Sequence, residues 1–252
     1  MSRGSVQIVS SLAETPISLA AGLRSGHSFK HLPGVIQGSK VGWSTIWRRG
    51  KETGEQLYPW YDVALSSVIV SSTSTSDTTN VTVEGLDINY AVKTETLTLN
   101  GTTDVTGSTN FRRIYKAHMS GNASNVGEVK VEMYNIGDNA YFPVATIAPG
   151  YGESQQSAYT VPAGHTAFVT SITAGSSKND SATQIALFAR ETGKAFLVKA
   201  NFFLSQETQK QIYDSPLMFS EKTDIDLRTY AASDAIISGS LDITLVSNKV
   251  LI

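Results

Sequence analysis

The sequence predicts an all-β protein: an antiparallel β-sandwich of jelly-roll type, in two β-lobes that follow an extended N-terminal arm. Three observations predict this fold class. Short runs rich in Val, Ile, Thr and aromatic residues recur from about residue 64 almost to the C-terminus. Gly, Asn, Asp and Ser separate these runs, as they do in sandwiches and jelly rolls. Several runs alternate apolar and polar residues, which is typical of strands with one buried face.

Residues 1–60 are predicted to form the arm and the irregular loops that lead into the first sheet. This region has no long alternating pattern, although residues 10–23 have a weak helical pattern. It contains all three tryptophans of the chain, Trp43, Trp47 and Trp60. Tryptophan is favoured both in cores and at interfaces, so two interpretations stay open. Either the aromatic side chains cover the core of their own chain, or the arm grips a neighbouring subunit.

Residues 61–150 are predicted to form the first β-lobe. The run EVKVEMY, residues 128–134, places its apolar residues on one face and its charged residues on the other. The pair Asn100-Gly101 tolerates the positive φ of a tight hairpin and is predicted to be a turn. The candidate strands of this lobe are LSSVIVSS, NVTVEGL, VKTETLTLN, FRRIYKAHM, EVKVEMY and YFPVATI.

Residues 151–252 are predicted to form a second, jelly-roll-like β-sandwich. A polar, Gly-rich segment at residues 148–159 marks the boundary. Residues 165–173 are predicted to be a strand in which positions 167, 169 and 171 share one face and positions 168, 170 and 172 the other. Residues 205–213 have a weak helical pattern. The other candidate strands are ATQIALFARE, KAFLVKANFFL, PLMFSEK, TDIDLRTYA and GSLDITLVS.

The composition limits the classes of function. Twenty basic and 22 acidic residues give a net charge of −2 without a basic block, so we expect no direct nucleic-acid binding. The absence of cysteine excludes disulfides, thiol nucleophiles and thiolate metal sites. The apolar pieces near the N-terminus are broken by polar residues, and we therefore expect neither a signal peptide nor a membrane span.

The residues capable of chemistry do not form a recognisable catalytic motif. The four histidines are scattered, and His27 and His31 have a helical spacing in a sequence that does not favour a helix. Asp224 and Asp226 share one face of a predicted strand. They could be a pair for glycosidic or calcium chemistry, but alternation alone predicts a solvated strand face, which we expect.

Two basic doublets, Arg48-Arg49 and Arg112-Arg113, lie in or near predicted strands. In an alternating strand one member of a doublet can face inward, so we expect a salt bridge rather than a nucleic-acid stripe. No nucleophile elbow and no phosphate loop occurs in the sequence. The residues therefore predict no catalytic, cofactor-binding or metal-binding site, no cofactor and no enzymatic activity.

A resemblance to a known family extends over most of the chain, from about residue 40 to 250. The specific part is the succession GLD, TETLTLNGTT and FRRIYKA, preceded by LYPW and followed by SNVGEVKV, QQSAYTVPAGHTAFVTSI and SEKTDIDLRTYAAS. This succession resembles a family of structural proteins of tailed bacteriophages, especially marine ones. The motif YTVPAG is common in β-sandwich proteins and adds little by itself.

The resemblance implies a non-enzymatic component of a virion, assembled in the host cytoplasm. A capsid decoration protein or another head-surface protein fits a rigid β-body with an arm, and its partners would be the major capsid protein or other virion proteins. The alternative is a tail-appendage or fibre protein that binds a host glycan and has tail components as partners. We also expect a homo-oligomer, with a trimer suggested by fold analogy, and no membrane contact.

Both roles assign the same aromatic residues to an interface or to a ligand. They are Trp43, Trp47, Tyr58, Trp60 and Tyr61.

Overall fold

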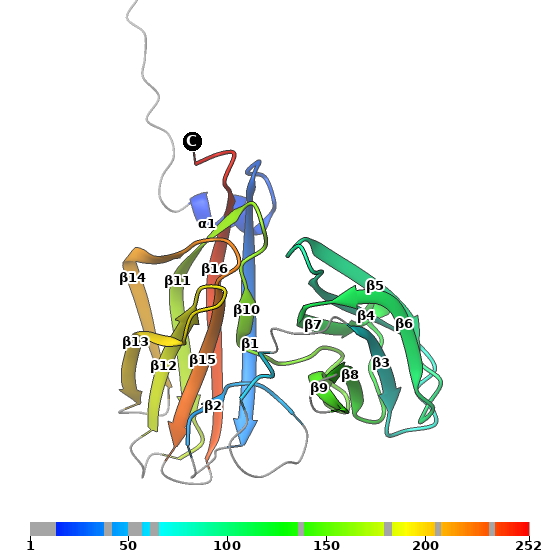
Figure 1. Ribbon diagram of the computed structural model, residues 1–252. Coiled ribbons are helices and arrows are strands. Elements are labelled where there is room, and N and C mark those ends of the chain that lie inside the picture. The colour runs from blue at the N-terminus through cyan, green and yellow to red at the C-terminus, as the bar shows by residue number, and fades with distance from the viewer. Residues whose placement is uncertain are drawn as a thin grey trace, which may run out of the picture.

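The computed structural model describes residues 14–37, 42–49, 57–60, 66–135, 139–178, 183–204, 208–231 and 235–251. Almost all regular structure in these residues is antiparallel β-strand, arranged in two lobes that lie side by side (Figure 1), which confirms the predicted fold class. The exceptions are the short helix α1, Glu14–Ala20, and the 3₁₀ turn η1, Ser120–Asn122. None of the helical segments described is long and apolar enough to span a membrane.

The larger lobe is a sandwich of two sheets. The first sheet has the order β1 (His27–Gln37), β16 (Ile236–Ser247), β11 (His165–Ser176) and β14 (Thr208–Phe219). The second has the order β10 (Ala158–Thr160), β15 (Asp224–Ala231), β12 (Thr183–Arg190) and β13 (Leu197–Leu204). A further short strand, β2 (Ser44–Thr45), pairs with the same edge of β15 as β10 does.

The strand order of this lobe is that of a jelly roll. We count β2 and β10 as one interrupted strand and number the described strands of the lobe from 1 to 8 along the chain. The first sheet then has the order 1-8-3-6 and the second sheet the order 2-7-4-5. Two interlocked Greek keys produce this order, which is why each sheet mixes strands from distant parts of the chain.

The smaller lobe is inserted into the jelly roll between β2 and β10. Its four-stranded sheet has the order β6 (Val105–Phe111), β3 (Ser66–Ser72), β8 (Val129–Asn135) and β9 (Ala140–Ile147). Its three-stranded sheet has the order β5 (Val92–Thr98), β4 (Asn80–Leu86) and β7 (Arg113–Met119). These strands enclose a separate apolar core built mainly from Val, Leu, Ile and Ala side chains.

Part of the predicted N-terminal arm belongs to the jelly roll. Residues 27–37 form β1, which pairs with β16 from His27↔Val246 to Gln37↔Ile236. The strand pattern is weak in the sequence because Pro33 and Gly34 interrupt it. Gly34 is required there, since a Cβ atom at this position would lie 2.0 Å from the carbonyl oxygen of Ile46.

The two weak helical patterns have different outcomes. Residues 10–23 contain α1, whereas the prediction for residues 205–213 is wrong because β14 begins at Thr208. In β14 the exposed and half-buried side chains alternate from Thr208 to Asp214, which is the pattern of an edge strand rather than of a helix.

The inserted lobe closes one open edge of the jelly roll. Leu86, Tyr90 and Tyr115 belong to the inserted lobe but are buried in the core of the jelly roll. Tyr90 lies in the loop between β4 and β5 with φ 61°, a conformation uncommon for tyrosine. Its carbonyl oxygen accepts a hydrogen bond of 3.0 Å from the N–H of Ala163 in the jelly roll. The core of the jelly roll therefore includes three side chains of the inserted lobe, and backbone hydrogen bonding also joins the two lobes.

Candidate functional site

The structure brings three of the predicted aromatic residues together. Trp47 and Tyr58 are buried, with ring centroids 5.4 Å apart, and Trp60 lies edge-on to Tyr58 at 4.7 Å. Trp43 lies apart from them, half-buried against Phe188 at 5.3 Å. Tyr61 lies outside the described residues.

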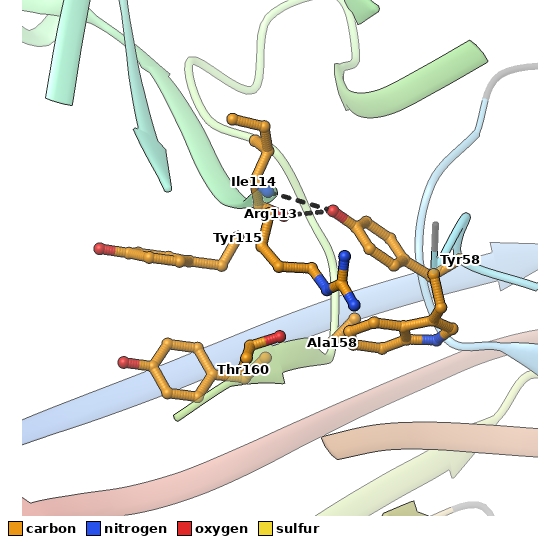
Figure 2. A pocket seen from close by; sticks show the side chains of 8 residues that line it. Tyr58, Arg113, Ile114, Tyr115, Ala158 and Thr160 are labelled. Carbon is orange, nitrogen blue, oxygen red and sulfur yellow. Dashed lines mark hydrogen bonds between the residues drawn. The ribbon is translucent and has the colours of Figure 1, made fainter. Parts of the chain in front are cut away.

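Tyr58 joins the two lobes by hydrogen bonds. Its hydroxyl donates to the carbonyl oxygen of Ile114 in β7 at 2.6 Å and accepts from the N–H of the same residue at 3.3 Å, as Figure 2 shows. Its backbone N–H donates to Oγ1 of Thr45 in β2 at 2.9 Å. Burial raises the pKa of the Tyr58 hydroxyl well above its ordinary value, so the group is a permanent donor.

A buried ionic cluster lies beside these aromatic rings on the outer face of β15. The strand register places Asp224 directly between Thr160 of β10 and Arg190 of β12. The Asp224 carboxylate accepts from Thr160 Oγ1 at 2.6 Å and from Arg190 Nε at 2.8 Å. These two bonds fix the position of the carboxylate, which Arg113 of the inserted lobe also contacts.

Arg113 provides the contact from the inserted lobe. Its Nε and Nη2 donate to the two carboxylate oxygens of Asp224 at 3.2 Å and 3.1 Å, and both side chains are almost fully buried. Burial alone would lower the pKa of the guanidinium, but the charge and hydrogen bonds of Asp224 outweigh it and raise the pKa. The guanidinium stays charged, and the two hydrogen bonds to Asp224 form a two-point bridge between the lobes.

Asp226 and Arg228 continue the cluster along β15. The Asp226 carboxylate accepts from Trp60 Nε1 at 2.9 Å and from Arg228 Nε at 2.8 Å. The guanidinium of Arg228 lies over the rings of Phe188 and Phe196, 4.4 Å and 4.6 Å from their centroids. Cations over aromatic rings are favourable, and most strongly so when they are desolvated.

The prediction of a solvated face for Asp224 and Asp226 is wrong. Alternation correctly separates them from Ile225 and Leu227, but Asp224 is 3% and Asp226 0% exposed. The outer face of β15 is not wet because the segment around Tyr58 and Trp60, together with β7 of the inserted lobe, covers it. The prediction that one member of a basic doublet faces inward to form a salt bridge is confirmed for Arg113.

The cluster has little space for a ligand. A narrow hollow lies beside Arg113 and is lined mainly by aromatic and aliphatic groups, but its free space does not accommodate even a water molecule. The carboxylate of Asp224 already accepts four hydrogen bonds, from Arg113, Arg190 and Thr160. The arrangement suits a rigid joint between lobes better than proton transfer to a substrate.

The histidines take up separate structural contacts. His27 and His31 lie four residues apart on β1, a separation of roughly 13 Å along a strand. His31 Nδ1 is 2.7 Å from the Asp242 carboxylate, and His27 Nδ1 is 2.9 Å from the carbonyl oxygen of Ser25. Within the described residues, no three His, Asp or Glu side chains are grouped so that they could hold a metal ion.

Arg190, Thr160 and Phe196 belong to the cluster but were not singled out by the sequence. Their role depends on the register of β15 with β10 and β12, and on a loop that folds back over that sheet. No local pattern carries this information. The only available signal was the unusual density of Asp and Arg on one face of TDIDLRTYA, which can also mean an exposed strand.

Comparisons with known proteins identify no family. No family model matches the chain, and no curated protein matches it. Similar solved structures include those of infectious bursal disease virus, Gt strain, with TM-score 0.22 and 9% identity over 88% of this chain and 73% of that one. They also include the VP2 subviral particle of that virus (TM-score 0.21, 10% identity, 89% and 73%) and its Gx strain (0.22, 10%, 86% and 71%). Chains with such low scores superpose poorly, so nothing is transferred from them.

Proposed function

We propose that this chain is a non-enzymatic structural protein of a virion, and specifically a decoration or other head-surface protein of a tailed phage. The proposal rests on one observation, which is the position of the buried ion pair between the two lobes. The ion pair in which both side chains are almost fully buried, Arg113 with Asp224, fixes one lobe to the other. A body made rigid in this way is suited to presenting fixed surfaces to neighbouring proteins.

Two further observations support this role. The larger lobe is a jelly roll, an architecture found in viral capsid proteins as well as in lectins and cupins. The sequence resemblance to phage structural proteins spans both lobes, from about residue 40 to 250. The partners proposed are the major capsid protein and further copies of the chain in the assembled particle.

Cryo-electron microscopy of the particle that carries this chain tests the proposal. We expect density for both lobes on the outer surface of the head, with the larger lobe recognisable by its two sheets. Binding of the purified protein to heads that lack it provides an independent test. Absence of the chain from purified particles, or density confined to the tail, would contradict the proposal.

The role of the N-terminal segment is tested in the same binding experiment. A variant without residues 1–26 keeps all of β1, because that strand begins at His27. If the segment anchors the protein, the truncated variant stays folded and no longer binds heads. Binding equal to that of the full chain would contradict the anchoring role.

A glycan-binding tail protein is the second candidate, and a specific observation favours it. Trp43 and Tyr230 lie 5.8 Å apart on the outer face of the second sheet, and Tyr230 is 43% exposed. Adjacent exposed aromatic rings are typical of surfaces that stack on sugars. Trp43→Ala should weaken binding to host envelope polysaccharide at least tenfold if this role is correct. The variant Ile236→Ala, at an exposed position of another sheet, is the matched control.

A further inference from the structure

No strand among the described residues covers the side of the jelly roll formed by β13 and β14. Figure 1 shows this side facing away from the inserted lobe, which closes the opposite side. Phe202, Tyr213 and Leu217 pack against the core but are only partly buried. Among the described strands, β13 pairs only with β12 and β14 only with β11, so each leaves one edge of backbone donors and acceptors unpaired. Natural proteins cover or pair such edges, because they otherwise recruit another chain.

Large apolar side chains are exposed along this side. Phe203 of β13 is 60% exposed, and Ile212 and Met218 of β14 are 64% and 69% exposed. Ile212 and Met218 lie on the outer face of the first sheet and Phe203 on the outer face of the second. Exposed apolar side chains on an edge strand such as β14 are typical of an interaction surface.

The outer face of β14 is self-complementary. Lys210, Ile212 and Asp214 are exposed on this face, while the residues between them are half-buried. If a second copy of β14 lies antiparallel with Ile212 opposite Ile212, then Lys210 of each copy faces Asp214 of the other. Cross-strand pairs of opposite charge stabilise an antiparallel ladder, and like charges destabilise it.

We propose that two copies of this chain associate through β14, in an antiparallel ladder centred on Ile212. The contact is isologous, since the same strand of each copy supplies both halves around a two-fold axis. It extends the first sheet of one jelly roll into the first sheet of the other. This inference does not depend on the proposed role in a virion.

The same two-fold axis brings the second layer together. Because the two-fold axis is perpendicular to the first sheet, it also relates the second sheets of the two copies. The β13 strands of the two copies therefore approach each other across this axis. Tyr213, which is half-buried, then lies opposite Gln211 of the partner and only two residues along the ladder from the partner's Tyr213. The side of each jelly roll formed by β13 and β14 thus faces the equivalent side of the other copy.

Pro216 limits the possible registers. The pairing of β14 with β11 is irregular between Ile212 and Leu217, so the proposed ladder is confined to Lys210–Asp214 and Pro216 lies beyond its end. A proline there costs little because it removes a hydrogen-bond donor only where the pairing stops. A shift that brought Pro216 toward the middle of the ladder would lose a hydrogen bond and place Lys210 away from Asp214.

A charge exchange tests the register. Sedimentation equilibrium should show the full-length protein as a dimer at micromolar concentration. Asp214→Lys places two lysine pairs across the axis and should raise the dimer dissociation constant about tenfold or more, since each of the two pairs changes from attraction to repulsion. The double variant Lys210→Asp with Asp214→Lys should restore dimerisation, because the charges are exchanged and remain opposite.

A cysteine at the axis provides a second test that does not depend on affinity. The chain has no cysteine, so Ile212→Cys introduces one thiol per copy. Residues directly opposite each other in an antiparallel ladder have Cβ atoms about 5 Å apart, within reach of a disulfide or a short bismaleimide. Ile212→Cys should give a covalent dimer, whereas Ile236→Cys, also exposed, should not.

Each outcome of these experiments either supports the proposed dimer or contradicts it. Monomeric wild-type protein at 100 μM would overturn the proposal, with circular dichroism confirming that the sample is folded. A dimer that is unaffected by Asp214→Lys, or one that the double variant does not restore, would also overturn it. A covalent dimer of Ile212→Cys together with rescue by the double variant would establish both the partner and the register.

Discussion

Arg113 and Asp224 form an ion pair in which both side chains are almost fully shielded from water. Transfer of two charges into the interior is costly, and their attraction compensates for it only when the remaining hydrogen-bonding capacity is also satisfied. Asp224 meets that condition through Thr160 and Arg190. The pair therefore contributes to the fixed arrangement of the lobes more than to net stability, and loss of one member is expected to be severe.

Replacing Arg113 by Met should destabilise the protein by about 3–5 kcal/mol, because it leaves the Asp224 charge buried without its partner. The matched control is Lys116→Met, on the same strand, which breaks the exposed Lys116–Glu153 pair at 3.0 Å. An exposed pair is worth about 0–1 kcal/mol. Urea denaturation followed by tryptophan fluorescence measures both values, and equal losses for the two variants would contradict the role of burial.

Asp77 is a further buried carboxylate, and it stabilises the inserted lobe. It accepts hydrogen bonds from Ser72 Oγ, from the N–H of Val126 at 2.8 Å and from the N–H of Gly127 at 2.8 Å. Burial alone would raise its pKa, but these three hydrogen bonds favour the charged form and lower the pKa below its ordinary value of 3.8. The stabilisation is thus present above pH 3.8 and is lost as the pH falls through the lower folded-state pKa.

Asp77→Asn should lower the melting temperature at pH 7 and reduce its dependence on pH in the acid range. The expected cost at pH 7 is about 1.5–3 kcal/mol, the range for hydrogen bonds to a charged group. Calorimetry from pH 7 to pH 2 measures both effects. Wild type and variant should approach each other at the lowest pH, and a difference that stays constant over the whole range would contradict the assignment. Asp104→Asn, at an exposed position of the same lobe, is the control.

At the scale of elements, alternation predicts most strands of the inserted lobe well. Val129 and Val131 are buried on one face of β8, and Gly101 has φ 58° in the turn after Asn100, both as predicted. These elements depend on local pattern and local turn chemistry, which one sequence contains.

Strand β11 marks a limit of alternation as a guide. The pairing of β11 is irregular between Val169 and Ser171, where the register with β16 shifts by one residue and the register with β14 shifts by three. This irregularity moves Ile172 to the buried face that Ala167 and Val169 occupy before it. A strict period of two places Ile172 on the opposite face. The sequence has no distinctive residue at the irregularity, so the change of face could not be predicted from it.

The close approach of Gly34 in β1 to Ile46, which follows β2, leads to a prediction at the scale of elements. Gly34→Ala would place a methyl group against the Ile46 carbonyl oxygen and Ser157 Oγ, so the strand must shift. We expect a loss of about 1–3 kcal/mol or more, as for other overpacked cores. Val35→Ala, on the other face of the same strand, should cost less than about 1.5 kcal/mol. Thermal unfolding distinguishes the two, and equal losses would contradict the steric argument.

At the scale of the whole molecule, the jelly roll is assembled from both ends of the chain. His27 pairs with Val246 and Thr45 with Arg228, across most of the sequence. Because these pairings join distant residues, the sequence alone predicts the strands of the second lobe but not that the first residues complete it. The joint at Asp224 is unpredictable for the same reason: it exists only after the inserted lobe has been placed on β15.

The inserted lobe has its own core, and this leads to a prediction about the whole molecule. Residues 66–147 expressed alone should fold, because the apolar cluster of this lobe is built from its own strands. The isolated lobe should unfold cooperatively in urea, and its slowest-exchanging amides should lie in β3, β4 and β8. Isolation exposes Tyr90 and Tyr115, which the jelly roll normally buries, so a variant with both changed to Ser serves as a control for association. Non-cooperative unfolding of both forms would mean that the lobe depends on the jelly roll for its fold, and that the two cores form a single folding unit.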